Sequence, residues 1–201
     1  PWQMITPSPP PSGTSTSALS QIELRTIPGT QTFRGAATVT GYTGPASGGG
    51  QDVVEFIYNH QTGSVLTLAT TGALNTAGNE FALSISEDGL TAVYDGPGGP
   101  YMSNRGGLAA NWGAPVALTG VPAGYIDSKC FTEGGQLKYA WVQGTDIWAG
   151  NLNFFNGTVT SPGLRIPATV AAGTSTPTGL HSHSPLTRQI AGQWIVTHWV
   201  F

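Results

Sequence analysis

The sequence is poor in charge. Asp, Glu, Lys and Arg make up 8% of its 201 residues, against roughly 25% in an average soluble domain. Lys and Arg together number seven. So few cations cannot neutralise a phosphate backbone, which excludes a strongly basic nucleic-acid-binding protein. Coiled coils and helical bundles that depend on rows of charged residues are excluded as well.

Cysteine and long apolar runs are also scarce. Cys130 is the one cysteine, so no intramolecular disulfide can form and a small disulfide-stapled scaffold is excluded. No apolar stretch approaches the length of a transmembrane helix. Apolar residues nevertheless make up 39%, with six Trp, six Tyr and seven Phe. That content is sufficient for a core and argues against a disordered chain.

Turn-forming residues are abundant, with 29 Gly and 15 Pro. They separate short stretches rich in Val, Ile, Thr and aromatics, whereas helical periodicity is nearly absent. This pattern predicts an all-β protein of the propeller, barrel or sandwich type. The low charge, the small number of Lys and the many Ser and Thr residues predict an extracellular or periplasmic location.

Two kinds of hairpin alternate along the chain, one with tight Gly-containing turns and one with longer turns. The first kind is expected at residues 81–94, 128–142 and 184–199. A weak copy is expected at residues 32–40, where the Gly-rich residues 41–50 replace the second strand. The second kind is expected at residues 2–27, 53–69, 101–118 and 146–166.

The second kind of hairpin starts near Trp2, Val53, Tyr101 and Ile147, a period of about 50 residues that matches the size of a propeller blade. We therefore predict a single domain over residues 1–201, a four-bladed β-propeller. The outer hairpin of residues 1–27 is expected to pair with the C-terminal strands of residues 184–200, so that both ends of the chain complete one blade and no free edge remains. A β-sandwich with coincidental spacing is the alternative, and five blades fit the spacing less well.

Two stretches resemble the repeats of TolB-like, or WD40-like, β-propellers. Residues 80–94 read Glu-Phe-Ala-Leu-Ser-Ile-Ser-Glu-Asp-Gly-Leu-Thr-Ala-Val-Tyr: an acidic residue, a short strand, Ser-x-Asp-Gly, and an apolar strand that ends in an aromatic. Asp146-Ile147-Trp148 is similar to that family's third-strand signature. The Ser-x-Asp-Gly turn is degraded at residues 133–135 and 189–192. The resemblance covers residues 51–152 and implies a fold without a particular chemistry.

In a propeller, the innermost strands and the loops that enter them border the central channel. The candidate residues there differ from blade to blade, which suggests one asymmetric site on the axis. Two further residues near loops, Tyr42 and Tyr125, are candidates to stack on sugar rings, although packing between blades is the more ordinary role. The proposed ligand-binding residues are Arg34, Lys129, Tyr125 and Tyr42.

His181 and His183 alternate on an expected strand, so both imidazoles can face the channel and share one divalent metal ion. Glu80 or Asp127 would supply an oxygen ligand, and these two carboxylates would also suit glycoside chemistry as a pair. The alternatives are that the histidines bond loop carbonyls and that the acidic residues bond backbone amides around the channel.

Two functional hypotheses follow. The first is a non-catalytic extracellular recognition module that binds a carbohydrate, a small ligand or a partner protein at the channel mouth. The second is a hydrolase or lyase in which His181 and His183 hold a metal or move protons while Glu80 or Asp127 assists. The absence of a catalytic motif favours the first, and the divergence between blades favours the second. A structural subunit of a larger assembly is a third possibility.

Overall fold

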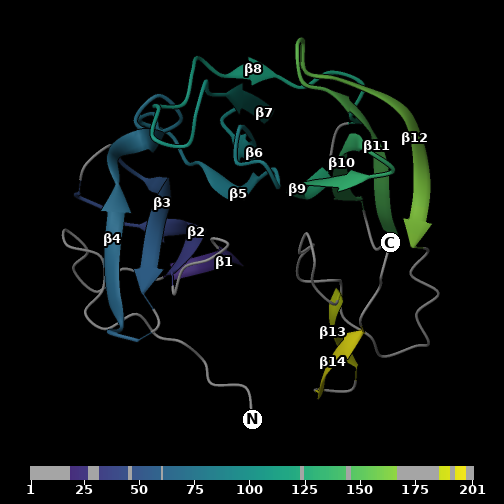
Figure 1. Ribbon diagram of the computed structural model, residues 1–201. Helices are drawn as coiled ribbons and strands as arrows, with labels where there is room; N and C mark the ends of the chain where they lie inside the picture. The colour runs from purple at the N-terminus through teal and green to yellow at the C-terminus, as the bar shows by residue number, and fades with distance from the viewer. Residues whose placement is uncertain are drawn as a thin grey trace.

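Antiparallel β-strands dominate the protein, with one short 3-10 helix at Ala69–Thr71 (Figure 1). In the described part of the chain, no helix is long and apolar enough to cross a membrane. The computed structural model describes residues 19–26, 32–44, 47–59, 61–122, 125–143, 146–166, 186–190 and 193–197.

Three sheets contain four strands each, connected in chain order, and a fourth contains two. The first sheet is formed by β1 (Leu19–Thr26), β2 (Thr32–Thr40), β3 (Gln51–Asn59) and β4 (Ser64–Leu68). The second is formed by β5 (Phe81–Ile85), β6 (Thr91–Gly96), β7 (Gly99–Asn104) and β8 (Val116–Ala117). The third is formed by β9 (Tyr125–Glu133), β10 (Gln136–Gln143), β11 (Asp146–Asn153) and β12 (Thr158–Ile166), and the fourth by β13 (Leu186–Ile190) and β14 (Gln193–Thr197).

The prediction of an all-β fold is confirmed, and tight turns form where glycines were expected to supply them. Gly134 and Gly135 both have positive φ, 57° and 73°, and they connect Glu133 to its partner Gln136. Two consecutive residues with positive φ are the geometry of a two-residue hairpin that follows the natural twist of the strands.

The sheets are arranged side by side around a common centre. β1, β5 and β9 lie nearest this centre, and β4, β8 and β12 lie at the outside (Figure 1). The third strands begin at residues 51, 99 and 146, close to the starts expected at residues 53, 101 and 147. Within the described residues, no strand pairing connects β13 and β14 with another sheet, so these residues do not by themselves close a ring.

The pairing of β1 corrects one expectation. Residues 21–27 were placed beside the C-terminal strands, but β1 pairs with β2, from Leu19 with Val39 to Thr26 with Phe33. β2 in turn pairs along its whole length with β3. The Gly-rich residues 41–50 therefore join two full strands and do not replace one. Residues 1–18, the rest of the expected closing hairpin, lie outside the described residues.

Buried side chains form three clusters that follow from this arrangement. The first lies between the first and second sheets and includes Val53, Leu83 and Trp112. The second lies between the second and third sheets and includes Met102 and Trp141. The third cluster contains Ala37, Val39, Tyr42, Val54 and Phe56. Because side chains alternate along a strand, it lies on the face of the first sheet opposite the first cluster.

Candidate functional site

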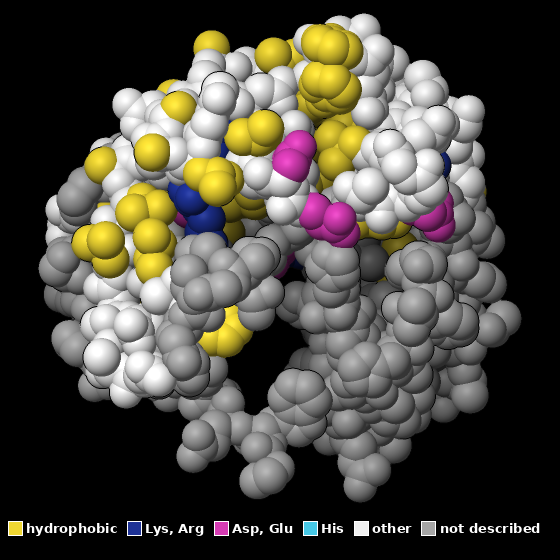
Figure 2. All heavy atoms as spheres, in the orientation of Figure 1, with side chains coloured by type: hydrophobic (Ala, Val, Ile, Leu, Met, Phe, Trp, Pro, Cys, Tyr) yellow, Lys and Arg dark blue, Asp and Glu magenta, His cyan; other side chains and the backbone are white. Residues whose placement is uncertain are grey.

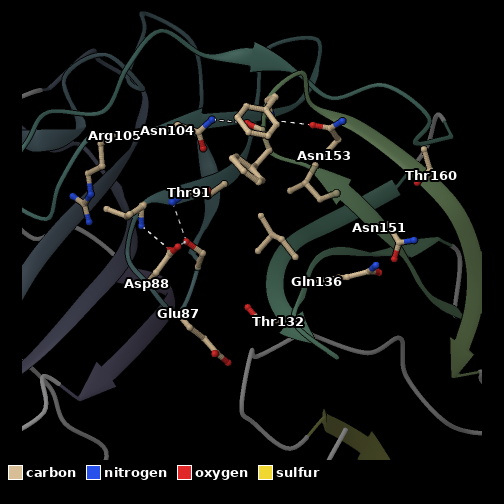
Figure 3. Close-up of a pocket in the computed structure, with 17 residues that line it drawn as sticks. Glu87, Asp88, Thr91, Asn104, Arg105, Thr132, Gln136, Asn151, Asn153 and Thr160 are labelled. Atoms are coloured by element: carbon tan, nitrogen blue, oxygen red, sulfur yellow. Dashed lines mark hydrogen bonds between the residues drawn. The ribbon is translucent and has the colours of Figure 1, made fainter.

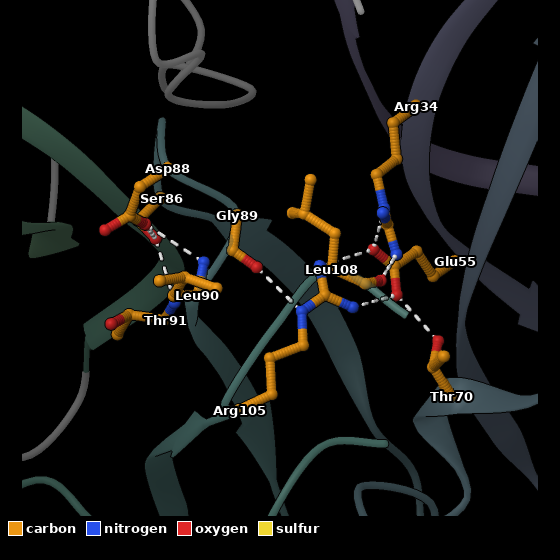
Figure 4. Close-up of polar contacts among 10 residues, drawn as sticks. All are labelled: Arg34, Glu55, Thr70, Ser86, Asp88, Gly89, Leu90, Thr91, Arg105 and Leu108. Carbon is orange, nitrogen blue, oxygen red and sulfur yellow. Dashed lines mark hydrogen bonds and ion pairs between the residues drawn. The ribbon is translucent and has the colours of Figure 1, made fainter. Parts of the chain in front are cut away.

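The interface between the first and second sheets, hereafter the first joint, contains a buried ion cluster (Figure 4). Glu55 on β3 is fully buried and accepts hydrogen bonds from Arg105 at 2.9 and 3.0 Å, from Thr70 at 2.7 Å, and from Arg34. Burial alone would raise the pKa of Glu55, but the hydrogen bonds from Arg105, Arg34 and Thr70 and the charge of Arg105 outweigh it and lower the pKa.

Both arginines of this cluster have further partners. Arg105 donates through Nε to the Gly89 carbonyl at 2.7 Å, and its guanidinium lies 4.0 Å from the centre of the Trp112 ring. Arg34 donates through Nη2 to the Leu108 carbonyl at 2.7 Å and has a side-chain exposure of 17%. Arg34, expected to bind ligand, is therefore engaged in holding the first two sheets together.

Lys129 on β9 is paired with Glu23 on β1, with 3.5 Å between Nζ and Oε2. The exposed fractions are 3% and 7%. The pair joins the innermost strands of the first and third sheets, so the one expected ligand-binding lysine already has a carboxylate partner. The backbones of Tyr125 and Asp127 lie in the same strand β9, but their side chains lie outside the described residues.

Tyr42 and Glu80 lie apart from this pair. Tyr42 is buried, and burial together with the nearby Asp52 carboxylate raises its pKa. Glu80 is fully buried, and its carboxylate accepts hydrogen bonds from the backbone N–H and the hydroxyl of Thr76. Glu80 therefore holds the loop that contains Thr76. This matches the alternative in which the acidic residues bond backbone amides. Burial and the charge of Glu80 raise the pKa of Tyr94.

The proposed metal site depends on His181 and His183, and both lie outside the described residues. Among the residues that are described, no group of three or more His, Cys, Asp or Glu side chains is placed to hold a metal ion. No observation on these residues favours the hydrolase or lyase hypothesis.

A cleft of about 1030 Å³ opens between the second and third sheets, at the interface hereafter called the second joint (Figure 3). It lies where the β5–β6, β9–β10 and β11–β12 turns meet. Most of its lining is polar and carries side-chain amides, hydroxyls and carboxylates. These polar residues are Ser86, Glu87, Asp88, Thr91, Asn104, Arg105, Thr132, Gln136, Asn151, Asn153 and Thr160.

Two phenylalanines stand at the rim of the cleft, on the turn of residues 154–157, hereafter the phenylalanine turn. Phe155 is 81% exposed and Phe154 45%, and their ring centres lie 4.0 Å apart. Hydrogen bonds hold the turn from both sheets: Asn104 Nδ2 donates to the Phe154 carbonyl at 2.7 Å, and the Phe155 N–H donates to Asn153 Oδ1 at 2.9 Å (Figure 3). The exposed rings are therefore carried on an ordered turn.

Hydrophobic side chains gather at the top of the molecule in Figure 2, where Figure 1 places β8 and the β11–β12 turn, and acidic side chains lie just below them. Contiguous exposed hydrophobic patches often mark binding sites, whereas single exposed hydrophobic residues are ordinary.

Among the residues whose side chains are described, each cationic group already has a carboxylate partner. Arg34 and Arg105 bind Glu55, and Lys129 binds Glu23. Lys138 lies 3.8 Å from a carboxylate oxygen of Glu133 and also donates to Asn151. A ligand in the cleft therefore meets amides, hydroxyls and aromatic rings, with the carboxylates of Glu87 and Asp88 at one wall.

Sequence reasoning missed this cleft. Residues 154–157 fall within the hairpin expected at residues 146–166, and Glu87 and Asp88 within the one expected at residues 81–94, but none of them is among the proposed site residues. One signal was available, because two consecutive phenylalanines are unusual in a turn, where Gly, Asn, Asp, Ser and Pro predominate.

Comparisons with known proteins give little further guidance. No protein-family model matches the sequence, and no curated protein matches it. Among solved structures, the crystal structure of an exo-β-1,3-galactanase from Phanerochaete chrysosporium with β-1,3-galactotriose aligns with a TM-score of 0.48 and 11% identity. The alignment covers 88% of this chain and 48% of that chain, so this chain spans about half of that protein's length. A likeness at this level assigns no activity.

Proposed function

We propose that this protein is a carbohydrate-recognition module that binds a neutral sugar in the cleft at the second joint. The observation that carries the proposal is the phenylalanine turn: two exposed rings, held by hydrogen bonds from both sheets, beside a polar cleft. The apolar face of a sugar ring packs on an aromatic ring, while its hydroxyls bond amides and other hydroxyls.

The lining favours a neutral ligand. The described cations are paired with carboxylates, so a phosphate or a uronic acid would find no positive charge that is not already compensated. The Glu87 and Asp88 carboxylates would repel such an anion. A large apolar ligand would in turn leave the amides of the cleft without hydrogen bonds, which is costly in a partly dry site.

The proposal extends to the architecture and location. The sheets would belong to a four-bladed ring of the TolB-like type in an extracellular or periplasmic protein. Support for a ring comes from the first sheet. Its face that points away from the second sheet carries the buried residues Val39, Val54 and Phe56. A blade on that side, built on β13 and β14, would cover this face.

Isothermal titration with a panel of oligosaccharides tests the function. The neutral members are xylan, mannan, cellulose, galactan and laminarin oligosaccharides, and hexagalacturonic acid is the anionic member. We expect at least one neutral member to bind and the double variant Phe154→Ala/Phe155→Ala to weaken that binding about thirtyfold. Truncation of an aromatic residue that anchors a ligand costs about 2 kcal/mol, and each 1.4 kcal/mol is about tenfold in affinity.

The matched control is Leu66→Ala, since Leu66 on β4 is 61% exposed and does not line the cleft. This variant should bind like the wild type. The proposal is wrong if no panel member binds, or if the double phenylalanine variant binds as tightly as the control.

A further inference from the structure

Three asparagines of the cleft have one end of the side-chain amide tied to the protein. Asn104 donates through Nδ2 to the Phe154 carbonyl. Asn153 accepts through Oδ1 from the Phe155 N–H. Asn151 accepts through Oδ1 from the Lys138 ammonium, which lies opposite it on β10.

Each of these hydrogen bonds fixes the orientation of the amide, because its partner either can only accept or can only donate. A carbonyl can only accept, so Asn104 must turn its NH₂ group to Phe154. A backbone N–H and an ammonium can only donate, so Asn153 and Asn151 must turn their oxygens to Phe155 and Lys138. Rotating any of the three amides would place two donors or two acceptors together.

The second polar atom of each amide is therefore fixed as either a donor or an acceptor. Asn104 keeps an acceptor, Oδ1, while Asn151 and Asn153 keep donors, Nδ2. Within the described residues these ends make no hydrogen bond, and all three residues line the cleft (Figure 3).

We propose that this fixed set of one acceptor and two donors determines the specificity of the cleft for sugars with unsubstituted hydroxyl groups. A hydroxyl donates one hydrogen bond and accepts others, so it satisfies Asn104 and Asn151 or Asn153 alike. A carboxylate only accepts, and it would face Asn104 Oδ1 without a proton to donate. Lys138 acts as a positioning residue, since it sets the orientation of Asn151. This inference rests on the proposed function.

Isosteric substitutions change only the amide atom that makes no hydrogen bond within the described residues. Asn151→Asp and Asn153→Asp keep the oxygen that bonds Lys138 or Phe155, and they replace the NH₂ donor with an acceptor. Asn59→Asp is the matched control: it makes the same change of atom and charge at the end of β3 in the first sheet, where Asn59 Oδ1 accepts from the Gln61 N–H at 3.0 Å, and Asn59 does not line the cleft.

Isothermal titration with the neutral oligosaccharide that binds the wild type most tightly, and with hexagalacturonic acid, gives the readout. We expect Asn151→Asp and Asn153→Asp each to weaken neutral binding about tenfold, and Asn59→Asp to change it less than about twofold. Lys138→Met should weaken binding by a smaller factor, and Lys138→Arg should restore it, since an arginine can donate to the same oxygen. Thermal unfolding of each variant checks that the fold is retained.

The outcomes separate the inference from the proposed function. If a neutral oligosaccharide binds and depends on Phe154 and Phe155, but the changes at residues 151 and 153 weaken binding no more than the change at residue 59, the inference is wrong and the function stands. Preference of the wild type for hexagalacturonic acid also overturns the inference. If the wild type binds no member of the panel, both are wrong.

Discussion

The two joints between consecutive sheets use polar residues in opposite ways. At the first joint, Arg34 and Arg105 bind the buried carboxylate of Glu55, and the loop that carries Leu108 contributes a carbonyl. At the second joint, the buried Asp95 carboxylate accepts hydrogen bonds from the Ser128 hydroxyl and backbone N–H, and a cleft lined with amides opens beside it. At the first joint the charged side chains bind one another and hold the sheets together, whereas at the second joint the polar side chains of the cleft remain accessible to a ligand.

This difference explains why charge was a poor guide to the site. The described cationic side chains are all paired with carboxylates, because a buried charge without a partner is very unfavourable. Most of the polar residues left for recognition in the cleft are therefore uncharged amides and hydroxyls. We therefore expect substitutions at the first joint to have large effects on stability and substitutions at the second joint to have large effects on ligand binding.

Glu55→Gln is expected to have the largest effect on stability. The substitution leaves two arginines without their carboxylate in a buried site, which should lower the free energy of unfolding by about 3–5 kcal/mol. Urea unfolding at pH 7 measures it. Glu87→Gln, at an exposed turn residue, is the control and should change stability by less than about 1 kcal/mol. Equal effects of the two substitutions would show that the ion cluster does not hold the first joint.

The same cluster should make stability depend on acid pH. The pKa of Glu55 is lowered from 4.5 in the folded protein, so the folded state binds its proton less readily than the unfolded state. The resulting stabilisation is fully present above about pH 4.5 and is lost as the pH falls through the folded pKa. The stability difference between wild type and Glu55→Gln should therefore narrow below pH 4.5 in urea titrations. A constant difference down to pH 3 would contradict this.

Ser128→Ala tests the second joint and should have an intermediate effect. The Ser128 hydroxyl is fully buried, bonds the Asp95 carboxylate and lies 2.6 Å from the Tyr139 hydroxyl. Its removal takes hydrogen bonds from both buried groups and should cost about 1–3 kcal/mol in unfolding free energy. Ser64→Ala, on the exposed edge strand β4, should stay within about 0.5 kcal/mol. A cost at Ser128 as small as that at Ser64 would show that the hydrogen bonds of Ser128 do not hold this joint.

Ala82→Gly should have the smallest effect. Ala82, the second residue of β5, has φ of +57°, where a residue with a side chain is strained by about 1 kcal/mol. Glycine removes this strain, which offsets the lost methyl burial and the greater freedom of the unfolded chain. Ala92→Gly, at an equally buried position in β6 without positive φ, should cost about 1–2 kcal/mol. Equal losses in thermal unfolding at the two positions would contradict the account.

Much of the strand content was predictable because turns are encoded locally. The glycine pair at 134–135 and Asp88-Gly89 marked hairpins that form as expected, since only certain residues adopt positive φ without strain. Strand partnership was less predictable. Residues 21–27 were expected to form a strand, and β1 (Leu19–Thr26) overlaps them. Their alternation does not say which neighbour they join, and β2 proved to be that neighbour.

The candidate site was hardly predictable. Arg34 and Lys129 were chosen because charged residues near an expected channel suggest ligand binding, but the partners that engage them, Glu55 and Glu23, come from distant parts of the chain. The cleft depends on three turns from two sheets that meet in space. The spacing of residues in the sequence does not show that these turns meet, and the asparagines that line the cleft look like ordinary strand and turn residues.

The most direct test of the central claim is to map the bound sugar by NMR, following backbone amide shifts while the tightest-binding neutral oligosaccharide is added. The account predicts that the largest shifts cluster at residues 86–91, 132–137 and 151–160, around the cleft of the second joint. Shifts centred instead on the first joint or on the innermost strands β1, β5 and β9, or no shifts at all, would contradict it.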